Sequence, residues 1–163
     1  MASECGIGAA DVLYDLGSGH GRLVLQAHLD WGVAGAVGVE LSRDRHLKGA
    51  RALERLRADG RIDPARHVEL INDNLLNVPC GDASVVYFAC TMWDADFVAT
   101  LLAKLDADCA GRGLRLLLST EDLEARFGVA PPPWMRRERA LATPMTWADD
   151  ARLYVYACDR TLA

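Results

Sequence analysis

Short apolar runs alternate along this chain with longer stretches in which apolar residues recur every three or four positions. The short runs predict buried strands, and the periodic stretches predict helices. The expected strands are Asp11–Leu16, Ala36–Leu41, His67–Ile71, Val85–Ala89 and Leu114–Ser119. The expected helices are Gly21–Trp31, closed by Gly32, a helix from Ser42 as N-cap to about Ala58, stopped by Gly60, and Asp94–Leu105.

The last third of the chain breaks this alternation. Three consecutive prolines at 131–133 exclude a helix or a central strand there. Beyond them, Arg136–Thr143 and Ala151–Asp159 alternate apolar and polar residues, with a turn expected around Thr146–Asp150. The pattern therefore predicts an α/β fold, in which a mostly parallel sheet carries helices on both faces and ends in an antiparallel hairpin.

The length and the charge of the chain limit its number of domains and its possible partners. The 163 residues suffice for a single domain with a normal core, and the formal net charge of −5 gives no overall attraction to nucleic acid or anionic membranes. No apolar run approaches the roughly 20 residues that cross a bilayer. Basic residues gather at Arg43–Arg57, expected to be a solvated helix face, and at Arg136–Arg139, expected to protect an edge strand or to form a local patch.

The five cysteines are scattered and include no C-x-x-C pair, so neither a metal site nor a disulfide framework is expected. The N-terminus has no basic segment followed by an apolar one, which argues against a secretory signal. We therefore expect an intracellular protein, cytoplasmic or nuclear.

The segment Asp15–Gly21, DLGSGHG, follows the first strand and opens the first helix. It is either a tight turn or a cradle in which a ligand lies against bare backbone, facing the N–H groups that begin the helix. The G-x-G-x-G spacing differs from the G-x-G-x-x-G of dinucleotide sites. Asp15 would repel a pyrophosphate but can pair with an ammonium, which favours S-adenosylmethionine. The loop residues Gly17, Ser18, Gly19, His20 and Gly21 are the candidate contacts.

Two further acidic residues follow the next two strands. Glu40, beside Leu41, is either a ribose-binding carboxylate or an exposed acid that favours the helix dipole. Asp73, beside Asn74, either accepts a hydrogen bond from an adenine amine or simply forms a turn. Acids at three successive strand ends favour a nucleoside site more than any one of them does alone.

The fourth strand leads into Ala89, Cys90, Thr91 and Trp93, a loop expected to face the reactive methyl group. Trp93 is either the wall of a slot for a substrate ammonium or a residue that packs on the core. Cys90 is expected to be a small buried residue rather than a nucleophile, and Asp94 the N-cap of its helix.

With these motifs the chain resembles the class I S-adenosylmethionine-dependent methyltransferases, whose Rossmann-like sheet ends in such a hairpin. The segments DLGSGHGRLVLQA, GVELS and VVYFACTMW look most like the disruptor-of-telomeric-silencing type, the non-SET histone lysine methyltransferases. The resemblance implies S-adenosylmethionine as cofactor and a lysine of a histone-like protein as substrate. It covers nearly the whole chain, so residues 1–163 are expected to form one domain.

The chain departs from that family at two places. Ala89 and Cys90 stand where the family carries an Asn pair, and only ten residues precede the first strand, so little or no N-terminal lid is expected and a partner could supply one. These departures leave open a catalytically impaired binding or scaffold domain, or a methyltransferase acting on a small molecule. A dinucleotide-dependent oxidoreductase is disfavoured by the glycine spacing and the terminal hairpin.

Overall fold

The computed structural model describes residues 1–109, 113–143 and 151–159 and divides into two compact units, of which one contains residues 2–79 and the other Met1 with residues 80–163. The turn expected around Thr146–Asp150 lies outside the described residues. Among the described residues, no helix combines the length and the apolar character needed to span a membrane.

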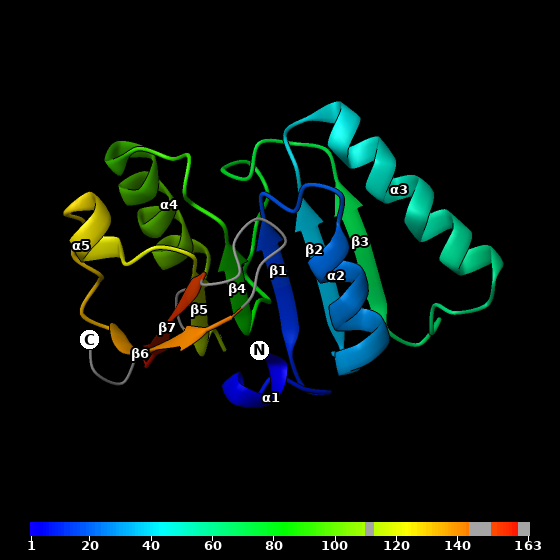
Figure 1. Ribbon diagram of the computed structural model, residues 1–163, viewed down its shortest axis with the longest axis horizontal. Helices are drawn as coiled ribbons and strands as arrows, with labels where there is room; N and C mark the ends of the chain where they lie inside the picture. The colour runs from blue at the N-terminus through cyan, green and yellow to red at the C-terminus, as the bar shows by residue number, and fades with distance from the viewer. Residues whose placement is uncertain (110–112, 144–150, 160–163) are drawn as a thin grey trace. The chain divides into compact units, whose positions relative to one another are not determined.

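The N-terminal unit is a parallel sheet with helices between its strands (Figure 1). Its strands are β1 (Val12–Leu16), β2 (Gly35–Val39) and β3 (His67–Ile71), hydrogen-bonded in the order β3-β2-β1. The helices are α1 (Ala2–Cys5), α2 (Arg22–Gln26) and α3 (Arg43–Ala58). All five residues of β2 are buried, as expected for a strand with a neighbour on each side.

The first long helix is less regular than its pattern predicts. α2 passes at Ala27–Trp31 into a π-helical turn, η1, and the left-handed Gly32 ends it as expected. The predicted bounds of α3 and β3 are confirmed, and the left-handed Gly60 follows α3. Ser42 occupies the N-cap position of α3, but its side chain makes no capping hydrogen bond.

The second expected strand was predicted too long. β2 ends at Val39, so Glu40 and Leu41 lie just beyond it, in the connection to α3. This places the Glu40 carboxylate at the carboxyl end of the strand, where ligands bind in sheets of this kind.

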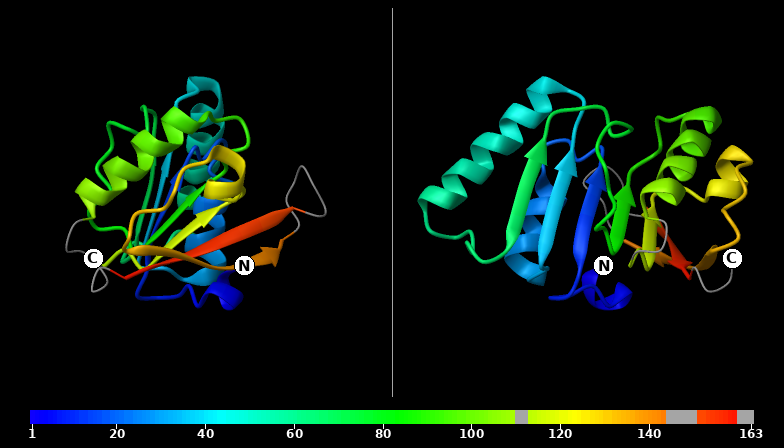
Figure 2. Two further views of the ribbon diagram at one scale, coloured as in Figure 1. Left: turned by 90° about the vertical axis from the view of Figure 1, so that its left-hand side faces the viewer. Right: turned by 180° about the vertical axis from the view of Figure 1, so that it is seen from behind.

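The C-terminal unit contains β4 (Val85–Phe88), α4 (Ala95–Asp108), β5 (Leu116–Ser119), α5 (Leu123–Phe127), β6 (Met135–Ala142) and β7 (Arg152–Cys158). β4 and β5 are parallel, and β7 pairs antiparallel with both β5 and β6, which confirms the terminal hairpin. β6 and β7 are the orange and red strands of Figure 2. A bulge interrupts their register between Arg137 and Arg139.

Both ends of α4 have local causes. The Asp94 carboxylate accepts a hydrogen bond from the Phe97 N–H at 2.8 Å, which confirms Asp94 as the N-cap. The helix continues to Asp108, one turn beyond the predicted end. There the Asp108 carboxylate pairs with Lys104 and accepts a hydrogen bond from the Cys80 N–H at 3.0 Å, which fastens the last turn to the start of the unit.

Candidate functional site

The glycine loop is anchored to the end of β2. The backbone N–H groups of Gly17 and Ser18 donate to the Val39 carbonyl at 2.8 and 3.0 Å. Gly17, Gly19 and Gly21 all have positive φ angles, of 91°, 55° and 70°, which other residues rarely adopt. A Cβ at Gly19 would meet no atom within 4 Å, so the space beside this part of the loop is open. The loop thus has the bare backbone that a bound ligand requires.

The structure brings Glu40 against this loop. One carboxylate oxygen, Oε2, accepts a hydrogen bond from the Gly19 N–H at 2.8 Å, and the other, Oε1, accepts one from the Ser42 N–H at 2.8 Å. Glu40 is only 5% exposed, and Arg45 lies 3.9 Å away on the solvent side. Each carboxylate oxygen can accept a second hydrogen bond, so the group can hold the loop and still accept from a diol. The contact with ribose stays a prediction.

Asp15 is a strongly perturbed acid of the N-terminal unit. It is 3% exposed, and among the described residues no group donates a hydrogen bond to its carboxyl. Burial, and secondarily the negative charge of Glu40, raise its pKa to about 7. A buried acid without a hydrogen-bond donor favours a cationic ligand, because an ammonium would compensate the lost hydration of the carboxylate.

The segment after β3 acts as a turn, as the alternative interpretation held. The Asp73 carboxylate accepts hydrogen bonds from the Asn74 N–H at 2.6 Å and from the Asn77 side chain at 2.9 Å, and Asn74 caps the Leu76 N–H at 3.0 Å. Asp73 is nevertheless exposed. An adenine contact at Asp73 and Asn74 therefore stays a prediction beside their observed role in the turn.

Asn72 has a role that sequence reasoning missed. Its side-chain amide donates to the carbonyls of Glu40 and Leu41 at 2.8 and 3.1 Å, so it ties the end of β3 to the backbone that carries the Glu40 carboxylate. Leu41 itself is 72% exposed. His20 is exposed inside the glycine loop, where a ligand could touch it.

The loop after β4, in the C-terminal unit, contains one buried residue, Cys90, between more exposed ones. Cys90 is fully buried, its thiol lies 3.2 Å from the Ser119 hydroxyl, and its N–H donates to the Thr120 hydroxyl. Burial raises the pKa of the thiol, so Cys90 is the small buried residue that we expected and not a nucleophile. Ala89 is half-buried beside it, and Thr91 is exposed.

Trp93 belongs to an aromatic cluster. Its ring stacks on Phe88 with centroids 5.4 Å apart and meets Phe97 edge-on at 5.0 Å. Because Trp93 is only half-buried, part of its surface remains available. The contacts favour the packing interpretation of this residue, and its role as the wall of a substrate slot stays a prediction.

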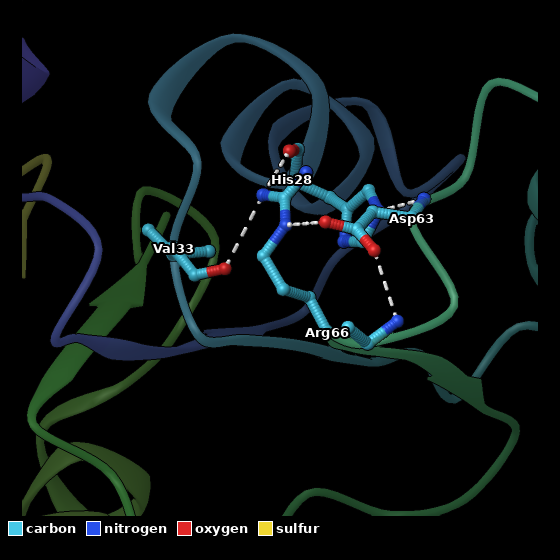
Figure 3. Close-up of polar contacts among 5 residues, drawn as sticks. His28, Val33, Asp63 and Arg66 are labelled. Carbon is cyan, nitrogen blue, oxygen red and sulfur yellow. Dashed lines mark hydrogen bonds and ion pairs between the residues drawn. The ribbon is translucent and has the colours of Figure 1, made fainter.

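A polar cluster around His28 ties η1 to the segment before β3, and no sequence pattern indicated it (Figure 3). His28 is fully buried, and its Nε2 accepts a hydrogen bond from the Asp63 N–H at 3.1 Å. The Arg66 guanidinium donates to the His28 carbonyl at 2.7 Å and to the Asp63 carboxylate at 2.9 Å. Burial, followed by the charge of Arg66, lowers the pKa of His28. The cluster therefore has a structural role.

Removal of this cluster's guanidinium should destabilise the protein. We expect Arg66→Ala to lower the free energy of unfolding by about 1–3 kcal/mol, because the His28 carbonyl loses a charged donor. Urea denaturation measures this, with Arg55→Ala as the matched control, since Arg55 is exposed and its guanidinium donates to the Arg51 carbonyl of its own helix. Equal stability of the two variants would show that the cluster contributes nothing.

Comparison with known proteins agrees with this geometry. The family described as histone methylation protein DOT1 matches residues 1–56. A protein-lysine N-methyltransferase of Saccharolobus islandicus is 33% identical over 76 residues, which is 47% of this chain and 44% of that protein. The chain therefore matches less than half the length of this curated relative.

Solved structures match almost the whole chain. An RNA methyltransferase from Salinibacter ruber, in complex with S-adenosyl-L-homocysteine, superposes with a TM-score of 0.70 at 20% identity, over 98% of this chain and 88% of that one. A ribosomal protein L11 methylase from Lactobacillus delbrueckii subsp. bulgaricus gives 0.66 at 14% identity, over 96% and 74%. These likenesses confirm the predicted Rossmann-like methyltransferase fold. The family match supports the predicted resemblance over residues 1–56.

Proposed function

We propose that this chain is an S-adenosylmethionine-dependent methyltransferase that methylates a lysine side chain of a protein. The observation that carries the proposal is the cluster in the N-terminal unit, where a buried acid, Asp15, precedes a glycine loop that Glu40 holds in place. The relatives named above are all methyltransferases, and one of the solved structures contains S-adenosyl-L-homocysteine.

The residues present fit this cofactor. Asp15 offers a carboxylate that no described residue neutralises, which suits the ammonium of an amino acid. Glu40 offers two carboxylate oxygens beside the open space at Gly19, which suits a sugar diol. Asp73 and Asn74 would contact the adenine. When bound, S-adenosylmethionine supplies a methyl group on a sulfonium that is already a good leaving group.

Methyl transfer asks little of the protein beyond alignment. The chain's own residues bind and orient, and the acceptor amine must reach the site in its neutral form, with its proton lost to water. We assign Ala89, Cys90, Thr91 and Trp93 to the acceptor side as a prediction. The buried Cys90 and the packed Trp93 supply no general base. This agrees with a reaction in which the protein mainly aligns the acceptor amine with the methyl group.

We further propose that residues 1–163 act as one methyltransferase domain. The structural likeness to the Salinibacter ruber enzyme, over 98% of this chain, supports a single domain. The protein-lysine substrate is supported by the DOT1 family match and by the Saccharolobus islandicus relative. The solved structures include both an RNA and a protein methylase, so the fold does not distinguish these substrates.

Transfer of a radiolabelled methyl group tests this function. We expect label from S-adenosylmethionine to enter histones or cellular proteins, and to be lost when their lysines are acetylated beforehand. Glu40→Ala should abolish most of the labelling. Labelling of RNA or of small amines alone would overturn the lysine substrate, and calorimetric binding of NAD without binding of S-adenosylhomocysteine would overturn the methyltransferase.

A cofactor-binding domain without transferase activity is the second candidate. The observation that favours it is position 90, where the family that the chain resembles carries a polar amide and this chain carries a buried thiol bonded to Ser119. Binding of S-adenosylhomocysteine with no labelling of proteins, RNA or small amines would establish this candidate instead.

A further inference from the structure

Two glycines of the N-terminal unit have no conformational reason to be glycine. Gly38 lies inside β2 and Gly49 inside α3, and neither has a positive φ angle. A glycine inside a helix or strand costs about 0.5–1 kcal/mol relative to alanine. Both positions therefore need another explanation, and the space around them provides it.

The missing side chains leave room for the glycine loop. A Cβ on Gly49 would lie 2.8 Å from the His20 carbonyl oxygen, and a Cβ on Gly38 would lie 2.8 Å from Ser18 Cβ. Real Cβ atoms do not approach other atoms so closely. Because Gly38 and Gly49 have no side chains, the backbones of β2 and α3 can pack directly against the loop.

One side chain fills the space that remains. A Cβ on Gly21 or on Gly38 would lie 2.8 Å from Leu70 Cδ2, and a Cβ on Gly49 would lie 3.1 Å from Leu70 Cδ1. The end of Leu70 therefore packs against the start of α2, against β2 and against α3 at the same point. Leu70 also lines a groove of about 460 Å³ between α3 and β3, together with Leu53 and Val68.

We propose that Leu70 is a positioning residue, whose side chain holds the glycine loop in the conformation that receives the ligand. The Leu70 side chain lies where side chains on Gly21, in the loop, and on Gly38, in β2, would have to be, and it contributes no polar group to the site. Leu70 fills the space that the missing side chains of Gly21, Gly38 and Gly49 leave. The hydrogen bond from the Gly19 N–H to Glu40 holds the loop at a second point. The effect on ligand binding rests on the proposed function; the effect on the loop does not.

Leucine-to-alanine substitutions at two positions provide a matched test. Leu70→Ala empties the gap, whereas Leu53→Ala removes the same atoms from a buried side chain that lines the same groove from α3. We expect Leu70→Ala to speed hydrogen exchange at the Gly19 amide and to weaken S-adenosylhomocysteine binding, each roughly tenfold, because the loop spends less time in the competent conformation. Leu53→Ala should change both only as far as its loss of global stability requires.

Two more variants keep the test decisive if Leu70→Ala does not fold. Leu70→Met places a side chain of similar size in the same space. Its rate of exchange at the Gly19 amide and its affinity for S-adenosylhomocysteine should lie within about twofold of the wild type. Gly49→Ala approaches the loop from α3 and should weaken ligand binding although alanine favours the helix.

The outcomes separate the inference from the proposed function. Equal effects of Leu70→Ala and Leu53→Ala on Gly19 exchange would overturn the positioning role, as would undiminished ligand affinity in Gly49→Ala. If the wild type binds no S-adenosylhomocysteine, the proposed function fails, and exchange at the Gly19 amide still decides the role of Leu70.

Discussion

Asp15→Asn is expected to make the protein more stable at pH 8 and at the same time to weaken its binding of S-adenosylhomocysteine at least tenfold. Asp15 is 3% exposed and receives no hydrogen bond from a described residue. Its charged form is therefore unfavourable in the folded protein, whereas a neutral amide of the same shape has a smaller desolvation cost than an ionised carboxylate. Loss of the carboxylate also removes the partner that we propose for the ligand ammonium.

The pH dependence of the stability follows from the raised pKa. The folded state holds a proton on Asp15 up to pH about 7, whereas the ordinary value for this group is 3.8. Between these values the folded state binds more protons than the unfolded state, so the wild type loses stability as the pH rises from 4 to 7. The advantage of Asp15→Asn should grow over that interval, to about 2–4 kcal/mol, and then level off.

Ligand affinity should depend on the same ionisation of Asp15, but it should rise with pH where the stability falls. A cationic ligand favours the ionised carboxylate, so wild-type affinity should rise between pH 6 and 8, and binding at pH 7 should release a proton from Asp15. Calorimetry in two buffers of different ionisation enthalpy measures this release. Asp15→Asn should show neither effect, and Asp11→Asn, a buried acid at the other end of β1, should keep both. A pH-independent wild-type affinity would contradict the ammonium contact.

Glu40→Ala is the second substitution with a large expected effect. It removes an acceptor of the Gly19 N–H and of the Ser42 N–H, together with the acceptor that we propose for the ribose. We expect S-adenosylhomocysteine binding to weaken by about 1–3 kcal/mol, and the control Glu54→Ala, an exposed acid on α3, to leave it unchanged.

A ligand analogue separates the two roles of Glu40. If the carboxylate binds the ribose, an analogue without the two ribose hydroxyls should bind the wild type more weakly than the parent ligand, and this difference should vanish in Glu40→Ala. A difference that persists in the variant would show that Glu40 only anchors the loop.

Much of the fold could be predicted because its elements carry regular patterns. The bounds of β3 and α3, the helix stop at Gly60 and the N-cap at Asp94 follow from local sequence and match the structure. The helices α1 and α5 were missed, because four or five residues are too few to show a helical period. The π-helical turn at Ala27–Trp31 was missed because one turn of altered pitch leaves the apolar spacing almost unchanged.

Site residues could be predicted where they belong to a local sequence motif. They could not be predicted where the site brings together segments that are far apart in the sequence. The glycine loop and Glu40 are recognisable because glycine spacing and an acid after a strand are local signals. Asn72 and Leu70 gave no such signal. Asn72 acts through two carbonyls more than 30 positions away in sequence, and Leu70 meets glycines from three separate elements. Such roles depend on tertiary proximity, which a single sequence does not reveal.

Trp93 illustrates the limit of residue-type reasoning. An aromatic residue near a substrate loop can bind a cation or can pack on its neighbours, and the sequence alone favoured neither. The contacts with Phe88 and Phe97 on either side along the chain show the packing directly.

A crystal structure with S-adenosylhomocysteine tests the central claim most directly. We predict the ligand beside Gly17 and Gly19, with its amino group next to Asp15 and its ribose hydroxyls on the Glu40 carboxylate. A complex in which the nucleoside lies elsewhere, or in which neither carboxylate touches it, would contradict the account.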